Sequence, residues 1–193
     1  RNSKEKNYMA SSAVSPASFL SKAEEYKLAG NDLFQKKEYK KAIIRFSRVR
    51  AYTWQPSGEA EQYAGNRSEA AKFTPEERSK LLRLDQIACG NIAQSYLNLG
   101  DSRQCIHYCE LVIGKFDDDK HPNPDLLVKA LSRSAQASLN SLDLDKAKSY
   151  INRALTIDPK STAARSVYRS LQAAFKQYNS EQKKVLSAAF ARA

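Results

Sequence analysis

The spacing of apolar residues limits the possible folds of this chain more than any other feature. Apolar residues recur at three- and four-residue intervals along almost the whole sequence, the spacing of one face of an α-helix. Only 6 glycines and 6 prolines interrupt it, and they cluster where helices are expected to end. Thr74-Pro75-Glu76-Glu77 is typical of a helix start, with an N-cap, a proline and two acids. The sequence therefore predicts an all-α protein, with helices over residues 17–36, 39–54, 75–99, 102–115, 124–141, 144–157 and 160–192.

Composition narrows the class of protein and its compartment. With 193 residues and a mean hydropathy of -0.64, the chain can form one domain with a core, and it has no apolar run that could span a bilayer. It also shows no secretory signal, and residues 1–8 precede Met9, the expected natural start. Three cysteines without a CxxC pair favour a reducing compartment, so we expect the cytosol or nucleus.

The net charge of +11 favours an acidic partner, which could be a nucleic acid, an anionic membrane surface or an acidic peptide. The basic residues are scattered along the chain, without the consecutive block that is typical of a nucleic-acid tail. Charge alone does not choose among the three.

Three segments of the chain align with one another as paired helices, beginning at Ala23, Gln86 and Leu127. Small residues recur at the eighth position of each segment and again at the twentieth, where they allow two helices to approach closely. We assign Gly30, Ala93 and Ser134 to the eighth position, Ala42, Cys105 and Ala147 to the twentieth, and Phe46, Cys109 and Ile151 to the twenty-fourth. Leu33 and Tyr96 are large residues at the eleventh position, from which Ala137 departs, and Pro159 closes the third segment.

These positions resemble those of tetratricopeptide (TPR) repeats. The resemblance implies three helix-turn-helix repeats in a right-handed superhelix with a long C-terminal capping helix, as in immunophilin co-chaperones and small stand-alone TPR proteins. We expect a flexible N-terminus (1–16) and a single, monomeric domain over 17–192. Its parts are repeats at about 23–56, 86–116 and 127–160, a polar insertion at 55–73 on the convex side, and a closing helix at 160–192 whose Val167, Leu171, Ala174 and Tyr178 cover the third repeat.

The resemblance also implies a binding site, because the first helix of each TPR repeat lines a concave groove. Lys27 and Asn31 lie on the first such helix, Asn91 on the second, and Lys129 and Arg133 on the third. By residue type and by position, these five residues match the two-carboxylate clamp of chaperone-binding TPR proteins. Lys129 and Arg133 stand four residues apart with no acid between them, a spacing at which like charges destabilise a helix by a few tenths of a kcal/mol.

A peptide that ends in Asp would suit such a clamp, because its side-chain and main-chain carboxylates lie close together. Charge-assisted hydrogen bonds contribute about 1.5–3 kcal/mol each. In the family pattern Lys27, Asn31, Asn91 and Lys129 surround these carboxylates, while Arg133 reaches upstream. Weaker candidates, for an apolar peptide residue, are Phe34, Gln94 and Leu97.

Other motifs carry less chemistry. Cys105 and Cys109 share a helix face from which His107 points away, so one zinc ion cannot collect all three, and we expect buried cysteines. The acidic segment 117–124 lacks the glycine and closing glutamate of an EF-hand. Asn66 is a glycosylation sequon by pattern only. We therefore predict no metal, no cofactor and no catalytic site.

The sequence thus favours a TPR adaptor or co-chaperone that binds the acidic, EEVD-type C-terminal tail of cytosolic Hsp90 or Hsp70 and is not an enzyme. Two alternatives stay open. One is a TPR scaffold for a protein segment without a free carboxyl group. The other is a basic helical solenoid that binds nucleic acid or anionic lipid, for which the basic clusters at 36–41 and 181–184 are the support.

Overall fold

A computed structural model describes residues 16–53, 73–117 and 123–190. These residues form an all-helical protein whose helices begin and end within two residues of the predicted positions. The helices are α1 (Pro16–Gln35), α2 (Tyr39–Thr53), α3 (Pro75–Asn98), α4 (Ser102–Asp117), α5 (Pro124–Asn140), α6 (Leu144–Ile157) and α7 (Thr162–Phe190). The predicted all-α class is confirmed.

Side-chain caps explain where several helices begin. The Thr74 hydroxyl accepts a hydrogen bond from the Glu77 amide (3.2 Å), and the Glu77 carboxylate accepts one from the Thr74 amide (2.9 Å). This reciprocal capping box satisfies amides that have no partner within the helix. Asn123 and Asp143 cap α5 and α6 without this reciprocity, because only their side chains accept a hydrogen bond, from Leu126 N (3.4 Å) and Lys146 N (3.1 Å). The helix start that the sequence predicted at Thr74 is confirmed.

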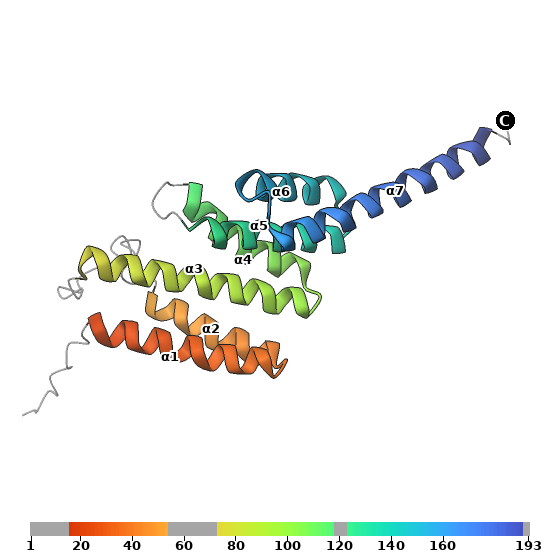
Figure 1. The fold of residues 1–193 in the computed structure, drawn as a ribbon. Helices are drawn as coiled ribbons and strands as arrows, with labels where there is room; N and C mark the ends of the chain where they lie inside the picture. The colour runs from red at the N-terminus through yellow and green to blue at the C-terminus, as the bar shows by residue number, and fades with distance from the viewer. Residues whose placement is uncertain (1–15, 54–72, 118–122, 191–193) are drawn as a thin grey trace, which may run out of the picture.

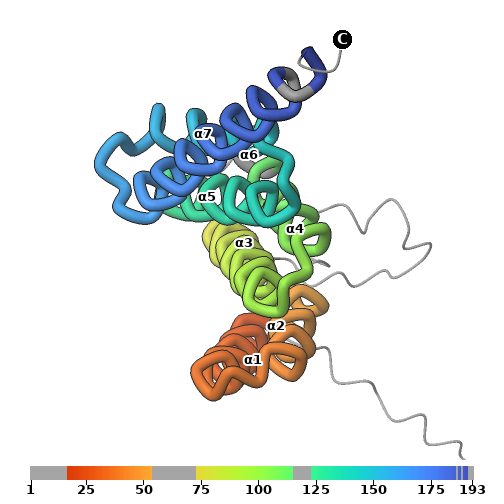
Figure 2. Tube along the Cα trace, turned by 90° about the vertical axis from the view of Figure 1, so that its right-hand side faces the viewer, coloured from red at the N-terminus to blue at the C-terminus, as the bar shows by residue number. Residues whose placement is uncertain are grey.

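The helices pack in two rows. Each helix contacts the next one along the chain, and α1, α3, α5 and α7 also contact one another in order. Within the described ranges, the backbones of α2, α4 and α6 do not come close to each other, and these helices meet through side chains such as Tyr150 and Glu110. Figure 1 shows the stack of helices along the chain, and Figure 2 shows α1, α3 and α5 on one side with α2 and α4 on the other. This is the TPR arrangement, a helical-repeat superhelix.

The turn within each repeat has one conformation. Lys37, Gly100 and Leu142 have positive φ angles of 60°, 78° and 61°. The residue after each of them donates a backbone hydrogen bond of 2.9 Å to a carbonyl five residues earlier. The three accepting carbonyls belong to Leu33, Tyr96 and Ser138. These residues therefore occupy equivalent positions in the three repeats.

This equivalence corrects the predicted register of the first helix of the third repeat by one residue, whereas Ala147 and Ile151 of the second helix were assigned correctly. Ala135, not Ser134, precedes the left-handed residue by the same seven positions as Gly30 and Ala93. Likewise Ser138, not Ala137, is the counterpart of Leu33 and Tyr96. The prediction failed here because the first helix was counted from Leu127, whereas Ala147 and Ile151 at the twentieth and twenty-fourth positions imply a start at Val128.

Small residues permit close helix pairs, as predicted. A Cβ atom added to Gly30 would lie 2.5 Å from Cε1 of Phe46, so α1 and α2 could not keep this spacing with any other residue there. Ala42, Cys105 and Ala147, the predicted small residues of the second helices, are all buried. The buried side chains form two clusters. The N-terminal cluster consists of Ala23, Ala42, Phe46, Val49, Leu84, Ala88 and Ile92. The C-terminal cluster extends from α3 to α7.

The closing helix docks through its first half. Val167 and Leu171 are buried in the C-terminal cluster, and Ala174 is half-buried, as predicted. Tyr178 is 52% exposed, so its predicted place in the covered stripe is wrong, and Phe175 packs against the cluster instead. The reason is length, because α7 continues beyond the third repeat and its second half projects away from the stack (Figure 1).

Two predicted segments fall almost entirely outside the described residues. The predicted flexible N-terminus overlaps them only at Pro16, and the predicted insertion at 55–73 only at Phe73. The predicted domain limits therefore stay predictions. Within the described ranges, none of the helices combines the length and the hydropathy that a membrane crossing requires.

Candidate peptide-binding site

The predicted clamp residues lie on the odd-numbered helices, and one hydrogen bond joins the first two of these helices. Asn91 Nδ2 on α3 donates to Asn31 Oδ1 on α1 at 3.3 Å, although 60 residues separate the two in sequence. Both side chains are half-buried. Lys27 is also half-buried and precedes Asn31 by one helical turn. The structure thus brings together Asn31 and Asn91, with Lys27 beside Asn31.

A second hydrogen bond joins α3 to α5. Arg133 Nε donates to Gln94 Oε1 at 2.8 Å, and Gln94 Nε2 donates in turn to Asn98 Oδ1 at 3.1 Å. The site prediction had assigned Gln94 to an apolar residue of the peptide. In the structure its carbonyl orients the guanidinium of Arg133. Lys129 precedes Arg133 by one turn and is exposed.

Gly90 makes room for Arg133 and was not among the predicted site residues. A Cβ atom added to Gly90 would lie 3.2 Å from Nη1 of Arg133, which is tighter than ordinary van der Waals contact. The guanidinium therefore lies close against the backbone of α3, next to Asn91. A glycine within a predicted helix was the available sequence signal, because such a glycine often marks a close approach.

The two interhelical hydrogen bonds follow one rule. Counted back from the left-handed residue in the turn of each repeat, Asn31 and Gln94 occupy equivalent positions, and so do Asn91 and Arg133. In both cases the amide of one repeat accepts a hydrogen bond from the next odd-numbered helix. We call the surface of α1, α3 and α5 that carries these side chains the odd-helix face.

The odd-helix face carries positive charge that nearby acids do not balance. Within the described part of the chain, ion pairs join Lys22 to Glu25, Lys41 to Glu38, and Arg50 to Asp85. Lys27, Lys129 and Arg133 take part in none of them. Burial lowers the pKa of Arg133, but a guanidinium stays protonated at neutral pH. A half-buried cation without an acid favours an anionic ligand.

The two other weaker candidates, Phe34 and Leu97, pack against the hydrophobic clusters. Phe34 meets Tyr39 edge to face with ring centroids 5.2 Å apart, and it packs against the N-terminal cluster. Leu97 packs against the C-terminal cluster. Both are half-buried, so their predicted contact with a peptide stays a prediction.

The cysteines lie beneath the site and not on its surface. Cys105 and Cys109 are both fully buried, whereas His107 is exposed. A hydrogen bond with Cys109, together with burial, raises the pKa of Cys105, so this thiol is a poor nucleophile and a poor metal ligand. Across the described ranges, no three His, Cys, Asp or Glu side chains gather in a group that could hold a metal ion.

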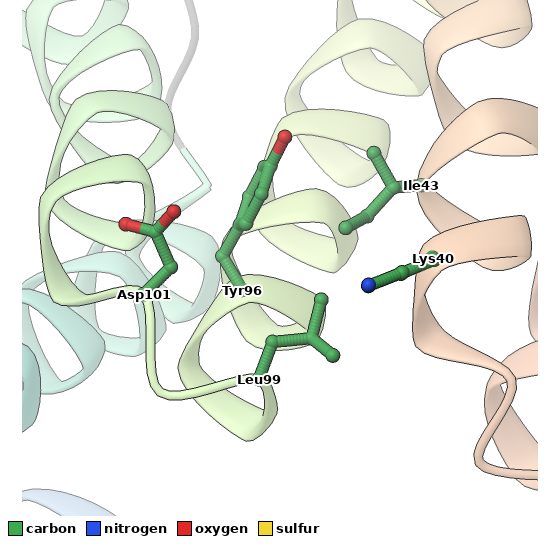
Figure 3. A pocket seen from close by; sticks show the side chains of 5 residues that line it. All are labelled: Lys40, Ile43, Tyr96, Leu99 and Asp101. Atoms are coloured by element: carbon green, nitrogen blue, oxygen red, sulfur yellow. The ribbon is translucent and has the colours of Figure 1, made fainter.

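Two surface hollows lie away from these residues. The first, of about 380 Å³, lies between α2 and the turn from α3 to α4 (Figure 3) and is lined by Lys40, Ile43, Tyr96, Leu99 and Asp101. The second, of about 410 Å³, is lined by Arg103, Ile106, His107, Glu110, Ser141 and Lys146. Each contains both acidic and basic side chains and none of the predicted clamp residues. Neither hollow therefore coincides with the predicted clamp.

Comparisons with known proteins agree with this fold. Residues 87–114 and 128–161 match the family model of the tetratricopeptide repeat. The C-terminal TPR-containing domain of a Plasmodium falciparum protein described as FK506-binding is similar in structure, with a TM-score of 0.63 and 19% identity, covering 86% of this chain and 96% of that chain.

Two similar structures contain chaperone peptides. The first TPR of Spaghetti (RPAP3) was solved with the HSP90 peptide SRMEEVD, with a TM-score of 0.54 and 20% identity, covering 81% of this chain and 95% of that chain. The second TPR domain of human RPAP3 was solved with the HSP70 peptide SGPTIEEVD, with a TM-score of 0.53 and 16% identity, covering 81% of this chain and 98% of that chain. The present chain therefore contains tetratricopeptide repeats, and its described helices have the fold of TPR domains.

Proposed function

We propose that this protein is a TPR adaptor that binds the acidic C-terminal peptide of a cytosolic Hsp90 or Hsp70 chaperone, ending in EEVD, on its odd-helix face. One observation carries the proposal. The hydrogen bonds from Asn91 to Asn31 and from Arg133 to Gln94 gather amide and guanidinium donors from three repeats on one surface, where the cations have no acidic partner.

The terminal Asp of such a peptide has two carboxylates, which need several converging donors. Lys27 and Asn31 are positioned to bind them from α1, Asn91 from α3 and Lys129 from α5. Asn91 uses one of its two amide hydrogens on Asn31, so the other is available to the ligand. Arg133 is held by Gln94 through Nε, which leaves its terminal nitrogens to bind an acidic or carbonyl group upstream in the peptide.

The peptide complexes of the similar structures support this proposal by analogy. In both, a TPR domain of the same fold is bound to a chaperone peptide that ends in EEVD. At 16% and 20% identity the likeness establishes the fold alone, so the chaperone partner rests on the clamp residues of this chain. The adaptor role, without catalysis and in the cytosol or nucleus, belongs to the same proposal.

Calorimetric titration of an EEVD-ending peptide and of its C-terminally amidated twin tests the proposal. We expect the amidated peptide to bind far more weakly, because it lacks the main-chain carboxylate. Arg133→Ala and Lys129→Ala should each lose about 2–5 kcal/mol of binding free energy, as expected when one partner of a desolvated charge pair is removed. Lys183→Ala, on the projecting half of α7, is the matched control and should bind like wild type.

The same titration separates the alternatives. Equal affinity for the free and the amidated peptide would contradict the proposal and favour a scaffold for an internal protein segment. Equal losses from Lys183→Ala and Lys129→Ala would show binding through general positive charge, the mode of a nucleic-acid or lipid binder. Repeating the titrations at two salt concentrations identifies that mode by its steeper salt dependence.

A further inference from the structure

Amide side chains recur at two equivalent positions of every repeat, and only one of these side chains, Asn31, belongs to the predicted clamp. Measured from the turn, the first position is occupied by Asn31, Gln94 and Gln136, and the second, one helical turn later, by Gln35, Asn98 and Asn140. The first three side chains are half-buried and the other three exposed. Packing does not require an amide at half-buried positions, where leucine or alanine would serve.

The pair in the third repeat repeats the geometry of the second. Gln136 Nε2 donates to Asn140 Oδ1 at 2.8 Å, as Gln94 Nε2 donates to Asn98 Oδ1 at 3.1 Å. In both pairs one amide fixes the orientation of the other. The glutamine carbonyl and the asparagine NH₂ group then remain available to a third partner.

The carbonyl of Gln136 differs from its counterparts in what it meets. Asn31 Oδ1 accepts from Asn91 and Gln94 Oε1 accepts from Arg133, each across to the next odd-numbered helix. One repeat length of about 34 residues after Arg133, the corresponding residue of α7 is Val167, which is buried and has no polar group. Among the described residues Gln136 Oε1 has no hydrogen-bond donor. The third pair therefore presents an acceptor and a donor that the fold itself does not use.

An acceptor beside a donor is the complement of a peptide main chain, which offers an N–H and a C=O on each residue. The distance also fits the proposed clamp. At about 1.5 Å per helical residue, Gln136 and Asn140 lie roughly 10 and 16 Å from Lys129 along α5. An extended peptide covers about 3.3 Å per residue, so this span corresponds to the fourth to sixth residues from its C-terminus, with the terminal residue counted as the first.

We infer that Gln136 and Asn140 form a second subsite, which binds the main chain of an extended peptide upstream of its terminal carboxylates. The subsite rests on the proposed function, because the clamp fixes the end of the peptide from which the distance is measured. It recognises backbone and not side chains, so it lengthens the bound segment without restricting its upstream sequence.

The experiment is a double-mutant cycle between protein and peptide. One partner is wild type or the double variant Gln136→Ala/Asn140→Ala. The other is a seven-residue peptide ending in EEVD, either unmodified or N-methylated at the fourth and fifth residues from its C-terminus. A tripeptide Glu-Val-Asp, which ends before the subsite, is titrated in parallel by NMR. Gln177→Ala is the matched control, because Gln177 also bonds to a residue four positions later, Glu181, but lies on the projecting half of α7.

We expect N-methylation to weaken binding to wild type about 5- to 10-fold, the worth of one net hydrogen bond. The double variant should bind the unmodified peptide about as weakly as wild type binds the N-methylated one. N-methylation should then weaken binding to the double variant by less than about twofold. Both proteins should bind the tripeptide equally, and Gln177→Ala should behave as wild type. An equal N-methylation loss in both proteins overturns the subsite, as does unchanged affinity of the double variant. If wild type binds neither peptide nor tripeptide, the proposed function fails and the subsite with it.

Discussion

The two hydrophobic clusters of this protein differ in size and in how far they depend on helix α3, to which both belong. Among the described residues, 17 buried side chains form the C-terminal cluster and 7 form the N-terminal cluster. Helix α3 contributes Cys89 and Ala93 to the larger cluster and Leu84, Ala88 and Ile92 to the smaller one. The first repeat therefore has little apolar burial of its own and depends on its junction with α3.

That junction is polar as well as apolar. Asp85 on α3 is buried, and its Oδ1 accepts hydrogen bonds from Arg50 Nε (3.2 Å) and Thr53 Oγ1 (3.1 Å), both on α2. The guanidinium of Arg50 lies 5.7 Å from the ring centroid of Tyr108 on α4, and Tyr108 stacks on Tyr96 of α3. The carboxylate of Asp85 thus joins α3 to α2, and the guanidinium that it binds also contacts α4. A paired buried charge gives orientation more than stability, but removing one partner is costly.

The difference bears on function, because the candidate site lies across the junction. Lys27 and Asn31 belong to the first repeat, which we call the smaller unit. Lys129 and Arg133 lie on α5, within the helices of the C-terminal cluster, which we call the larger unit. A peptide that contacts both would tie the smaller unit to the larger one. Ligand should therefore protect the first repeat from local unfolding more than it protects the third.

Asp85→Ala tests the junction with the largest expected effect. It leaves Arg50 and Thr53 without their carboxylate, so we expect the free energy of unfolding to fall by about 3–4 kcal/mol. Hydrogen exchange should accelerate more in α1 and α2 than in α5 and α6. Asp145→Ala, an exposed aspartate in the first turn of α6, is the control, with an expected change within about 0.5 kcal/mol. A similar loss for both variants in urea titrations would show that the junction does not hold the first repeat.

Leu171→Ala weakens the larger cluster without touching the junction. Leu171 is 2% exposed in α7, and truncating a buried leucine typically costs about 2–5 kcal/mol, so we expect roughly 3. Exchange should then accelerate in α5 and α6 before α1. Tyr178→Ala, one turn beyond the docked part of the same helix, should change the melting temperature little, since Tyr178 is 52% exposed. Equal effects of the two substitutions would mean that the whole of α7 docks.

Gly30→Ala overpacks the smaller cluster. The added methyl group would lie 2.5 Å from the ring of Phe46, and such overpacking typically costs about 1–3 kcal/mol. Gly114→Ala in α4 is a control of opposite sign, because a Cβ atom there meets no atom within 4 Å. It should stabilise the protein by about 0.5–1 kcal/mol through helix propensity. Thermal unfolding that moves both variants in the same direction would contradict this account of Gly30.

The helices and most of their small buried residues could be predicted from sequence, because caps and apolar spacing are local signals. Thr74 and Pro75 indicated the start of α3 correctly. The first helix of the third repeat was misaligned by one residue because its positions were counted from Leu127, one residue before the start that Ala147 and Ile151 imply. Tyr178 continues the apolar stripe of α7, but sequence spacing does not reveal where the neighbouring helix ends.

The candidate site was predictable only as a set of helix positions. Resemblance placed Asn31, Asn91 and Arg133, but their hydrogen bonds depend on how far apart α1, α3 and α5 lie, which local sequence does not encode. The predicted contact of Gln94 with a peptide stays a prediction, whereas its hydrogen bond to Arg133, which lies close to Gly90, was not foreseen. Gln136 and Asn140 were missed, because the recurrence of amides becomes visible only in the corrected register.

Tyr150→Phe has the smallest expected effect, because it removes one solvent-accessible hydrogen bond between two helices that contribute to the C-terminal cluster. Tyr150 on α6 donates a hydrogen bond from its hydroxyl to Glu110 Oε1 on α4 at 2.8 Å. At neutral pH its loss should cost only about 0.5 kcal/mol, because water competes for both groups. Burial, together with this bond to Glu110, raises the pKa of Tyr150 above its ordinary value near 10.

The direction of that shift fixes the pH dependence. A pKa raised in the folded state gives a contribution that is complete below about pH 10 and is lost as the pH rises toward the folded pKa. Phenylalanine cannot ionise, so the stability advantage of wild type over Tyr150→Phe should shrink between about pH 8 and pH 11. Other tyrosines and lysines titrate in both proteins and cancel in the difference. Urea midpoints at the two pH values measure it, and an advantage that stays constant or grows with pH would show that the hydroxyl of Tyr150 is not held by Glu110 in the folded state.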